Sequence, residues 1–165
     1  MKKVGIVMGS DSDIAVAKKA ADILDKLNIP YEVHVYSAHR TPTLSAEFSS
    51  SAEANGFGVI IAMAGMAAHL AGAIAANTVL PVIGVPVKSS FDGLDALLAT
   101  VQMPKGIPVA TVAVDGGANA AFLAAQILAL GDSEISKKLK EIRKENEKEI
   151  IEKDKNINSK LKGEG

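Results

Sequence analysis

Residues 4–13, Val-Gly-Ile-Val-Met-Gly-Ser-Asp-Ser-Asp, join a short apolar run to a cluster of turn-forming residues. The run over residues 4–8 predicts a buried strand. The residues after Met8 are of the types that favour turns and helix N-caps. Apolar residues then recur at helical spacing up to Asn28, and Pro30 stops that pattern. The opening segment is therefore predicted to form a strand, a turn and a helix.

The same alternation of short apolar runs and helical patterns continues along the chain. Further strands are predicted over residues 31–36, 59–63, 81–85 and 109–114. Further helices are predicted over residues 43–55, 65–77, 94–101 and 118–130, and from 133 to about 160. Five strands that alternate with helices predict a parallel sheet covered on both faces, a doubly wound three-layer α/β domain. Ligands of such sheets bind beyond the carboxyl ends of the strands, so a site is expected in the loops after strands one to four.

The chain has 165 residues, a length that suggests one domain. We assign residues 1–131 to the α/β body and residues 132–165 to a charged helix and tail of the same domain. The last 34 residues carry 19 charged side chains around an interrupted apolar stripe of Ile135, Leu139, Ile142, Asn146 and Ile150. This pattern is typical of a helix that is solvated or that braces a neighbouring subunit.

The composition argues against several classes of protein. The chain has no cysteine, so disulfides, thiolate catalysis and cysteine-bound metals are excluded, and its three histidines lack a recognised metal-site spacing. A net charge of -1 and 4% aromatic residues give no case for binding nucleic acid or an anionic membrane. Residues 54–87 are uncharged, but glycine and proline interrupt them, so no membrane span is expected. The start does not resemble a signal peptide, and a cytoplasmic location is expected.

The uncharged tract has a second implication. Its alanine-rich stretch at residues 65–77 has no obvious solvent face as a helix, so we expect it to pack against other chains. A helix covered within one subunit is the alternative.

The loop after the first strand could bind a nucleotide. Backbone N–H groups at a helix N-terminus suit a phosphate, and Ser10 and Ser12 add hydroxyl groups. A carboxylate such as Asp13 would repel phosphate and is better suited to a ribose diol. The loop is neither a dinucleotide fingerprint nor a P-loop. A plain helix cap at Ser10 or Asp11 is the alternative.

Two histidines could carry chemistry. Residues 37–42, Ser-Ala-His-Arg-Thr-Pro, follow the second strand, and Thr41 before Pro42 is a typical helix entry. His39 could donate and accept protons near neutral pH, and Arg40 could hold a phosphate or a carboxylate. A surface capping turn is the alternative here. His69 is the single ionisable side chain of the long uncharged tract, and a core or interface histidine is its alternative reading. We treat His34, mid-strand and without a companion, as structural.

Taken together, these segments resemble the N5-carboxyaminoimidazole ribonucleotide mutase family over nearly the whole chain. The resemblance rests on six segments in the expected order, residues 7–13, 37–42, 67–70, 81–87, 101–109 and 119–128. It implies a flavodoxin-like three-layer αβα subunit with a central parallel sheet, in a homo-octamer whose sites lie where subunits meet. It also implies carboxyl transfer from the exocyclic nitrogen of the ribonucleotide to carbon 4 of its imidazole in purine (IMP) biosynthesis. Neither a cofactor nor a metal is implied.

The resemblance also implies roles for individual residues. By motif match, His39 would be the general acid/base. The residues that would bind or line the ribonucleotide are Ser10, Ser12, Asp13, Ser37, Ala38, Arg40, Gly65, His69 and Leu70. The chain departs from the family pattern at Met63 and Met66, where glycines are usual, and at Ala71, where proline is usual. These departures would place bulk near the site.

Two other functions stay open. The first is an enzyme of the same superfamily that carboxylates aminoimidazole ribonucleotide directly with carbon dioxide. Arg40, Pro42 and His69 favour the mutase over this enzyme. The second is a non-catalytic nucleotide-binding module on the same fold.

Overall fold

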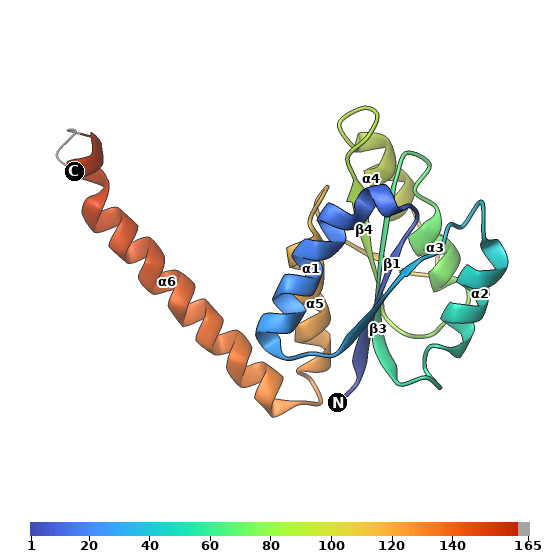
Figure 1. Ribbon diagram of the computed structural model, residues 1–165, viewed down its shortest axis with the longest axis horizontal. Helices are drawn as coiled ribbons and strands as arrows, with labels where there is room; N and C mark the ends of the chain where they lie inside the picture. Colours follow the sequence, from blue (N-terminus) through green and yellow to red (C-terminus); the bar gives the residue numbers. More distant parts are fainter. Residues whose placement is uncertain (162–165) are drawn as a thin grey trace.

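The computed structural model describes residues 1–161, which form one sheet of five parallel strands (Figure 1). The strands are β1 (Lys3–Met8), β2 (Tyr31–Val35), β3 (Phe57–Gly65), β4 (Val82–Val87) and β5 (Ala110–Thr111). Their order across the sheet is β2-β1-β3-β4-β5, the order of flavodoxin-like folds. The chain therefore reverses its winding direction between β1 and β3, and the carboxyl ends of these two strands form the switch point.

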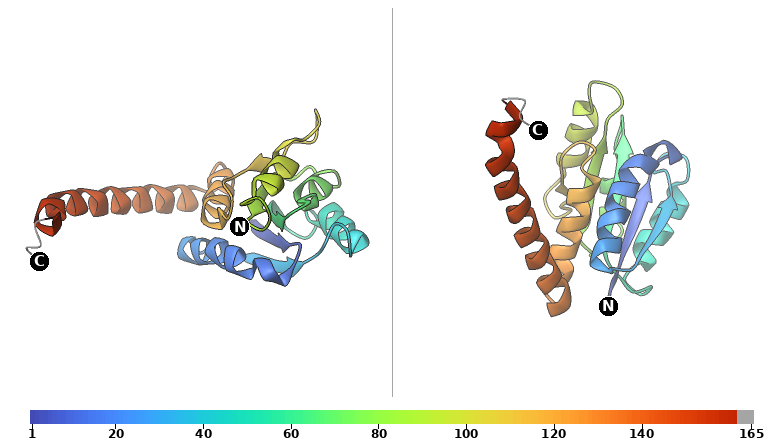
Figure 2. Two further views of the ribbon diagram at one scale, coloured as in Figure 1. Left: turned by 90° about the horizontal axis from the view of Figure 1, so that it is seen from above. Right: turned by 60° about the vertical axis from the view of Figure 1, so that its left-hand side comes forward.

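Helices cover both faces of this sheet, as the sequence predicts (Figures 1 and 2). They are the short 3-10 helix η1 (Asp11–Asp13), α1 (Ile14–Leu27), α2 (Pro42–Ser51), α3 (Leu70–Ala75), α4 (Leu94–Val101), α5 (Gly117–Leu128) and α6 (Ser133–Leu161). The first and fifth α-helices pack on one face, and α2, α3 and α4 lie on the other. The predicted three-layer architecture is confirmed.

The central strands are buried on both sides. In β1, Val4, Ile6 and Met8 belong to the core under α1 and α5, whereas Val7 belongs to the core on the opposite face. A strand that is covered on both faces has no polar alternation. This is why β1, β3 and β4 appear in the sequence as nearly continuous apolar runs.

The prediction of a helix over residues 65–77 is wrong for residues 65–69. The β3 strand continues to Gly65 because it stays paired with β4 as far as Val87. Met66 then adopts a left-handed backbone with φ of +54°, and α3 begins only at Leu70. Strand pairing thus overrides the helix preference of the alanines. Four of the six residues of α3 are buried in the chain's own core, so contact with other chains stays a prediction.

The predicted strand over residues 109–114 is also too long. β5 pairs with β4 only through Ile83 with Ala110 and Gly84 with Thr111. Pro86 accepts a hydrogen bond from the Asp115 N–H (2.9 Å), so its backbone faces the β5 side. Because proline has no N–H to donate, the ladder cannot continue past this residue.

The last helix leaves the body of the protein (Figure 2). Its first turns bury Ile135 and Ile142 against the core, and the Lys138 ammonium donates to the Leu27 carbonyl (2.9 Å). Beyond Ile142, the described side chains are exposed, including Ile150 and those that follow it. Within residues 1–161, no helix is both long and apolar enough to cross a membrane. The predicted tail at residues 162–165 lies outside the described residues, and the division at residue 131 stays a prediction.

We expect the contact between α5 and α1 to fail when Gly117 gains a side chain. A Cβ atom at this position would lie 2.2 Å from the Val16 carbonyl oxygen, and neither backbone can easily move. Gly117→Ala should lower the free energy of unfolding by roughly 1–3 kcal/mol, measured by thermal or denaturant unfolding. Gly131→Ala is the matched control, because a Cβ atom there meets nothing within 4 Å. Equal stability of the two variants would contradict this account.

Candidate functional site

The loops that follow β1, β2, β3 and β4 surround a cavity of about 660 Å³ at the carboxyl edge of the sheet. The structure brings together nine residues that the sequence analysis singled out. They are Ser10, Ser12, Asp13, Ser37, Ala38, His39, Arg40, Gly65 and Leu70. These residues come from three loops far apart in the sequence, and the strand order places them side by side.

His69, the remaining candidate, does not line the cavity but contacts His39. The Nε2 atom of His39 lies 2.9 Å from the Nδ1 atom of His69, and the two rings are nearly perpendicular at 82°. One of these nitrogens must carry the proton of the hydrogen bond while the other accepts it. The tautomer of each neutral ring is therefore set by its neighbour.

The turn that presents His39 is held by its own residues. The Thr41 hydroxyl accepts from the Ser37 N–H (2.8 Å) and donates to the Ser37 carbonyl (3.2 Å). The Arg40 N–H donates to the Ser37 hydroxyl (3.2 Å). Thr41 does occupy the N-cap position of α2, with Pro42 next, but its side chain does not cap the helix. The hydroxyl closes the turn instead, which fixes the backbone on either side of His39.

Arg40 joins two of the site loops. Its Nη2 atom donates to the Gly9 carbonyl (3.0 Å) at the end of β1. Arg40 is exposed, and a guanidinium group can bind phosphate or carboxylate with two parallel hydrogen bonds.

The loop after β1 contains a buried carboxylate. Ser10 is the N-cap of η1 and accepts from the Ser12 N–H (3.3 Å), while the Ser12 hydroxyl donates to Asp13 Oδ1 (3.2 Å). Asp13 is only 7% exposed. Burial raises the pKa of its carboxyl group, and hydrogen bonds from Ser12 and the Ser10 backbone oppose that rise. Ser10 therefore caps the helix and also lines the cavity. A capping role and a binding role for this residue are thus compatible.

The loops after β3 and β4 close the remaining walls. Of the three departures from the family pattern, Met66 lines the cavity and is 59% exposed. Met63 and Ala71 are buried in the core and do not line the cavity, although the adjacent Ala64 and Leu70 do. Lys88 also lines the cavity, and the sequence analysis missed it. The available signal was that Lys88 is the first charge after the uncharged tract and directly follows a strand.

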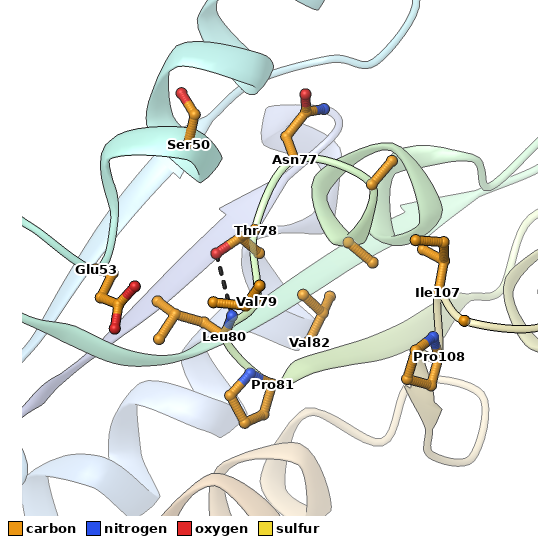
Figure 3. Close-up of a pocket in the computed structure, with 13 residues that line it drawn as sticks. Ser50, Glu53, Asn77, Thr78, Val79, Leu80, Pro81, Val82, Ile107 and Pro108 are labelled. Carbon is orange, nitrogen blue, oxygen red and sulfur yellow. Dashed lines mark hydrogen bonds between the residues drawn. The ribbon is translucent and has the colours of Figure 1, made fainter.

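A second cavity, of about 840 Å³, opens at the opposite edge of the sheet (Figure 3). It lies between the end of α2, the connection that leads into β4, and residues 106–108. Glu53 is the single ionisable side chain among its lining residues. It offers no pair of groups that could exchange a proton, so the cavity beside His39 is the candidate site. Among residues 1–161, no cluster of three His, Asp or Glu side chains could hold a metal ion.

Comparisons with known proteins show the family to which this chain belongs. The family described as AIR carboxylase matches residues 3–149. The N5-carboxyaminoimidazole ribonucleotide mutase of Pyrococcus horikoshii is 55% identical over 155 residues, 93% of this chain and 88% of that protein. The enzyme of the same name from Escherichia coli K12 is 54% identical over 153 residues, 91% and 90% of the two chains. The crystal structure of Treponema denticola PurE has a TM-score of 0.85 at 35% identity and covers 92% of this chain and 96% of that one. This chain therefore belongs to the AIR carboxylase family.

Proposed function

We propose that this chain is an N5-carboxyaminoimidazole ribonucleotide mutase, an isomerase of purine biosynthesis. Its relatives at 55% and 54% identity carry that name. The observation that carries the proposal is the hydrogen bond between the rings of His39 and His69. It lies beside a cavity large enough for a nucleotide. A reaction that moves a carboxyl group between nitrogen and carbon needs a proton acceptor and donor at neutral pH, which imidazole provides.

The polar groups of the cavity suit a ribonucleotide. The Asp13 carboxylate would accept hydrogen bonds from the ribose hydroxyls. Arg40 would donate to anionic oxygens, and Ser10 and Ser12 would do so after releasing their hydrogen bonds to Asp11 and Asp13. The groups that would surround the imidazole ring are Ser37, Ala38, Gly65, His69 and Leu70. The assignments rest on the motif match and on the position of each residue at the cavity, except that His69 contacts His39 and does not line the cavity.

The chemical step requires two proton transfers, one from His39 and one back to it. The carbamate on the exocyclic nitrogen releases carbon dioxide, and protonated His39 gives that nitrogen a proton. Carbon 4 then attacks the retained carbon dioxide, and neutral His39 removes the proton from carbon 4, which restores both the aromatic ring and the catalyst. Recombination within one site is effectively intramolecular and can contribute several kcal/mol. The contact with His69 holds the His39 ring in place for both transfers.

Retention of carbon dioxide requires a cover over the cavity. His39, Arg40, Met66 and His69 are all exposed in the single chain. Exposed apolar side chains border the same edge, among them Phe91 at 82% and Leu94 at 56%. We therefore propose that neighbouring subunits of a homo-octamer close the site, as the family resemblance implies. A cytoplasmic location likewise stays a prediction.

Substrate preference is the direct test of this function. The purified protein is offered N5-carboxyaminoimidazole ribonucleotide, or aminoimidazole ribonucleotide with bicarbonate, in separate assays. We expect rapid conversion of the carbamate and little use of bicarbonate. The family description, AIR carboxylase, makes direct carboxylation the leading alternative, and preference for bicarbonate would establish it. Binding without turnover of either substrate would favour the non-catalytic module.

The role of His39 is tested by His39→Asn. Turnover should fall by roughly 10²–10⁴-fold, because general acid/base catalysis is lost. The melting temperature and the affinity for aminoimidazole ribonucleotide should stay close to those of the wild type. His34→Asn is the control, because His34 stacks on Tyr36 away from the cavity. Undiminished turnover of His39→Asn would remove this residue from the mechanism.

Asp13→Asn should have opposite effects on the stability of the protein and on its affinity for the ribonucleotide. Burial raises the pKa of Asp13, so the folded state binds the proton more tightly than the unfolded state and the ionised carboxylate lowers stability at neutral pH. The variant should therefore melt at a higher temperature than the wild type at pH 7. That advantage should shrink as the pH falls through the raised pKa, where wild-type Asp13 becomes protonated. Affinity for the ribonucleotide should fall roughly tenfold as a charged acceptor is lost. A melting temperature below that of the wild type at pH 7 would contradict the cost of burial.

A further inference from the structure

Lys88 is a charged residue of the cavity wall that the proposed mechanism leaves without a task. It directly follows β4, the strand on the far side of β1 and β3 from the loop that carries His39. Among the residues that line the cavity, Arg40 and Lys88 carry positive charge and Asp13 carries negative charge. The site is therefore built with cations on two opposite walls.

The backbone of Lys88 is fixed in place. Its N–H donates to Asp115 Oδ1 (2.9 Å), and the Asp115 N–H donates to the Pro86 carbonyl (2.9 Å). Asp115 thus bridges the end of β4 and the connection that precedes α5. Because both bonds converge on one residue, the lysine side chain starts from a rigid point at the rim of the cavity.

The side chain of Lys88 is held much more weakly. Its ammonium group pairs with Asp92 Oδ1 at 2.9 Å, and the two side chains are 59% and 88% exposed. An exposed pair of this kind contributes little net free energy, so an anion in the cavity can replace Asp92. Phe91 and Asp92 both have left-handed backbones, with φ of +46° and +54°, a conformation that is strained for residues other than glycine.

We propose that Lys88 binds an anionic oxygen group of the substrate, a phosphate or a carboxylate, and gives up its ion pair with Asp92 to do so. The inference rests on the proposed function for the ligand, a ribonucleotide with both groups. The loops that carry Arg40 and Lys88 follow strands three positions apart in the sheet, roughly 14 Å at the usual strand spacing. One cation cannot contact both ends of an extended nucleotide, and Arg40 is already tied to Gly9.

The test is Lys88→Met, which keeps the apolar stem and removes the charge. Its matched control is Lys18→Met, because Lys18 forms a similar exposed pair with Asp22 (2.8 Å, also four residues apart) and does not line the cavity. Titration calorimetry measures binding of aminoimidazole ribonucleotide, its 4-carboxy derivative, and the two matching ribosides. We expect Lys88→Met to weaken binding roughly tenfold and Lys18→Met to leave it unchanged.

The four ligands identify the anion. A loss shared by both nucleotides and absent from the ribosides assigns Lys88 to the phosphate. A loss confined to the two carboxylated ligands assigns it to the carboxylate. If Lys88→Met matches Lys18→Met for all four ligands, the inference is overturned.

Asp92→Asn is an independent test, because it should change the binding affinity in the opposite direction to Lys88→Met. Asparagine keeps the shape of aspartate and tolerates a left-handed backbone, so the loop should persist while Lys88 is released. Binding should tighten a few-fold, and weaker binding would overturn the proposed exchange even if Lys88→Met fails to fold. Wild-type turnover is measured on the same preparation. If the wild type binds but does not convert the carbamate, the proposed function fails while the assignment of Lys88 stands.

Discussion

Parallel strands that are buried on both faces need crossover helices between them, and these crossovers place every carboxyl end at one edge. The order β2-β1-β3-β4-β5 satisfies this constraint, and it brings the loops that line the cavity to the same edge. His39 and His69 are 30 residues apart in the chain, yet their ring nitrogens lie 2.9 Å apart. Nothing local in the sequence joins these two rings. They meet because their loops leave neighbouring parts of the same sheet edge.

Small residues let the helices pack closely on the sheet, which fixes the positions of the strand ends at the carboxyl edge. A Cβ atom on Gly84 would lie 2.3 Å from the methyl group of Thr100, so glycine lets α4 pack directly on β4. On the other face, alanines on one side of α5 are fully buried against the sheet and α1. Close packing of this kind leaves the strands little freedom to shift, and the loops at their ends inherit that rigidity.

The layers and most strands could be predicted because burial on both faces leaves an unmistakable apolar run in the sequence. Residues 65–69 and 112–114 could not be predicted in the same way, since their structure depends on pairing with β4 and on Pro86 within it. Motifs in the sequence indicated the loops that surround the cavity beside His39 and most of the residues that line it. Two features of the site depend on strand order: the hydrogen bond between His39 and His69, and the position of Lys88 at the cavity. The hydrophobic pattern of a single sequence does not specify that order.

The turns of α6 after Ile142, as far as residue 161, do not contribute to the packed core or to the cavity beside His39. The described side chains after Ile142 are exposed, and the match to the family ends at residue 149, inside this helix. Apart from the exposed ion pair of Glu145 with Lys26 (3.4 Å), mutations there change helix propensity and surface charge. Natural selection can thus reshape this stretch without disturbing the chemistry at the sheet edge, and a partner that covered it would leave its imprint as preserved isoleucines at positions 150, 151 and 157.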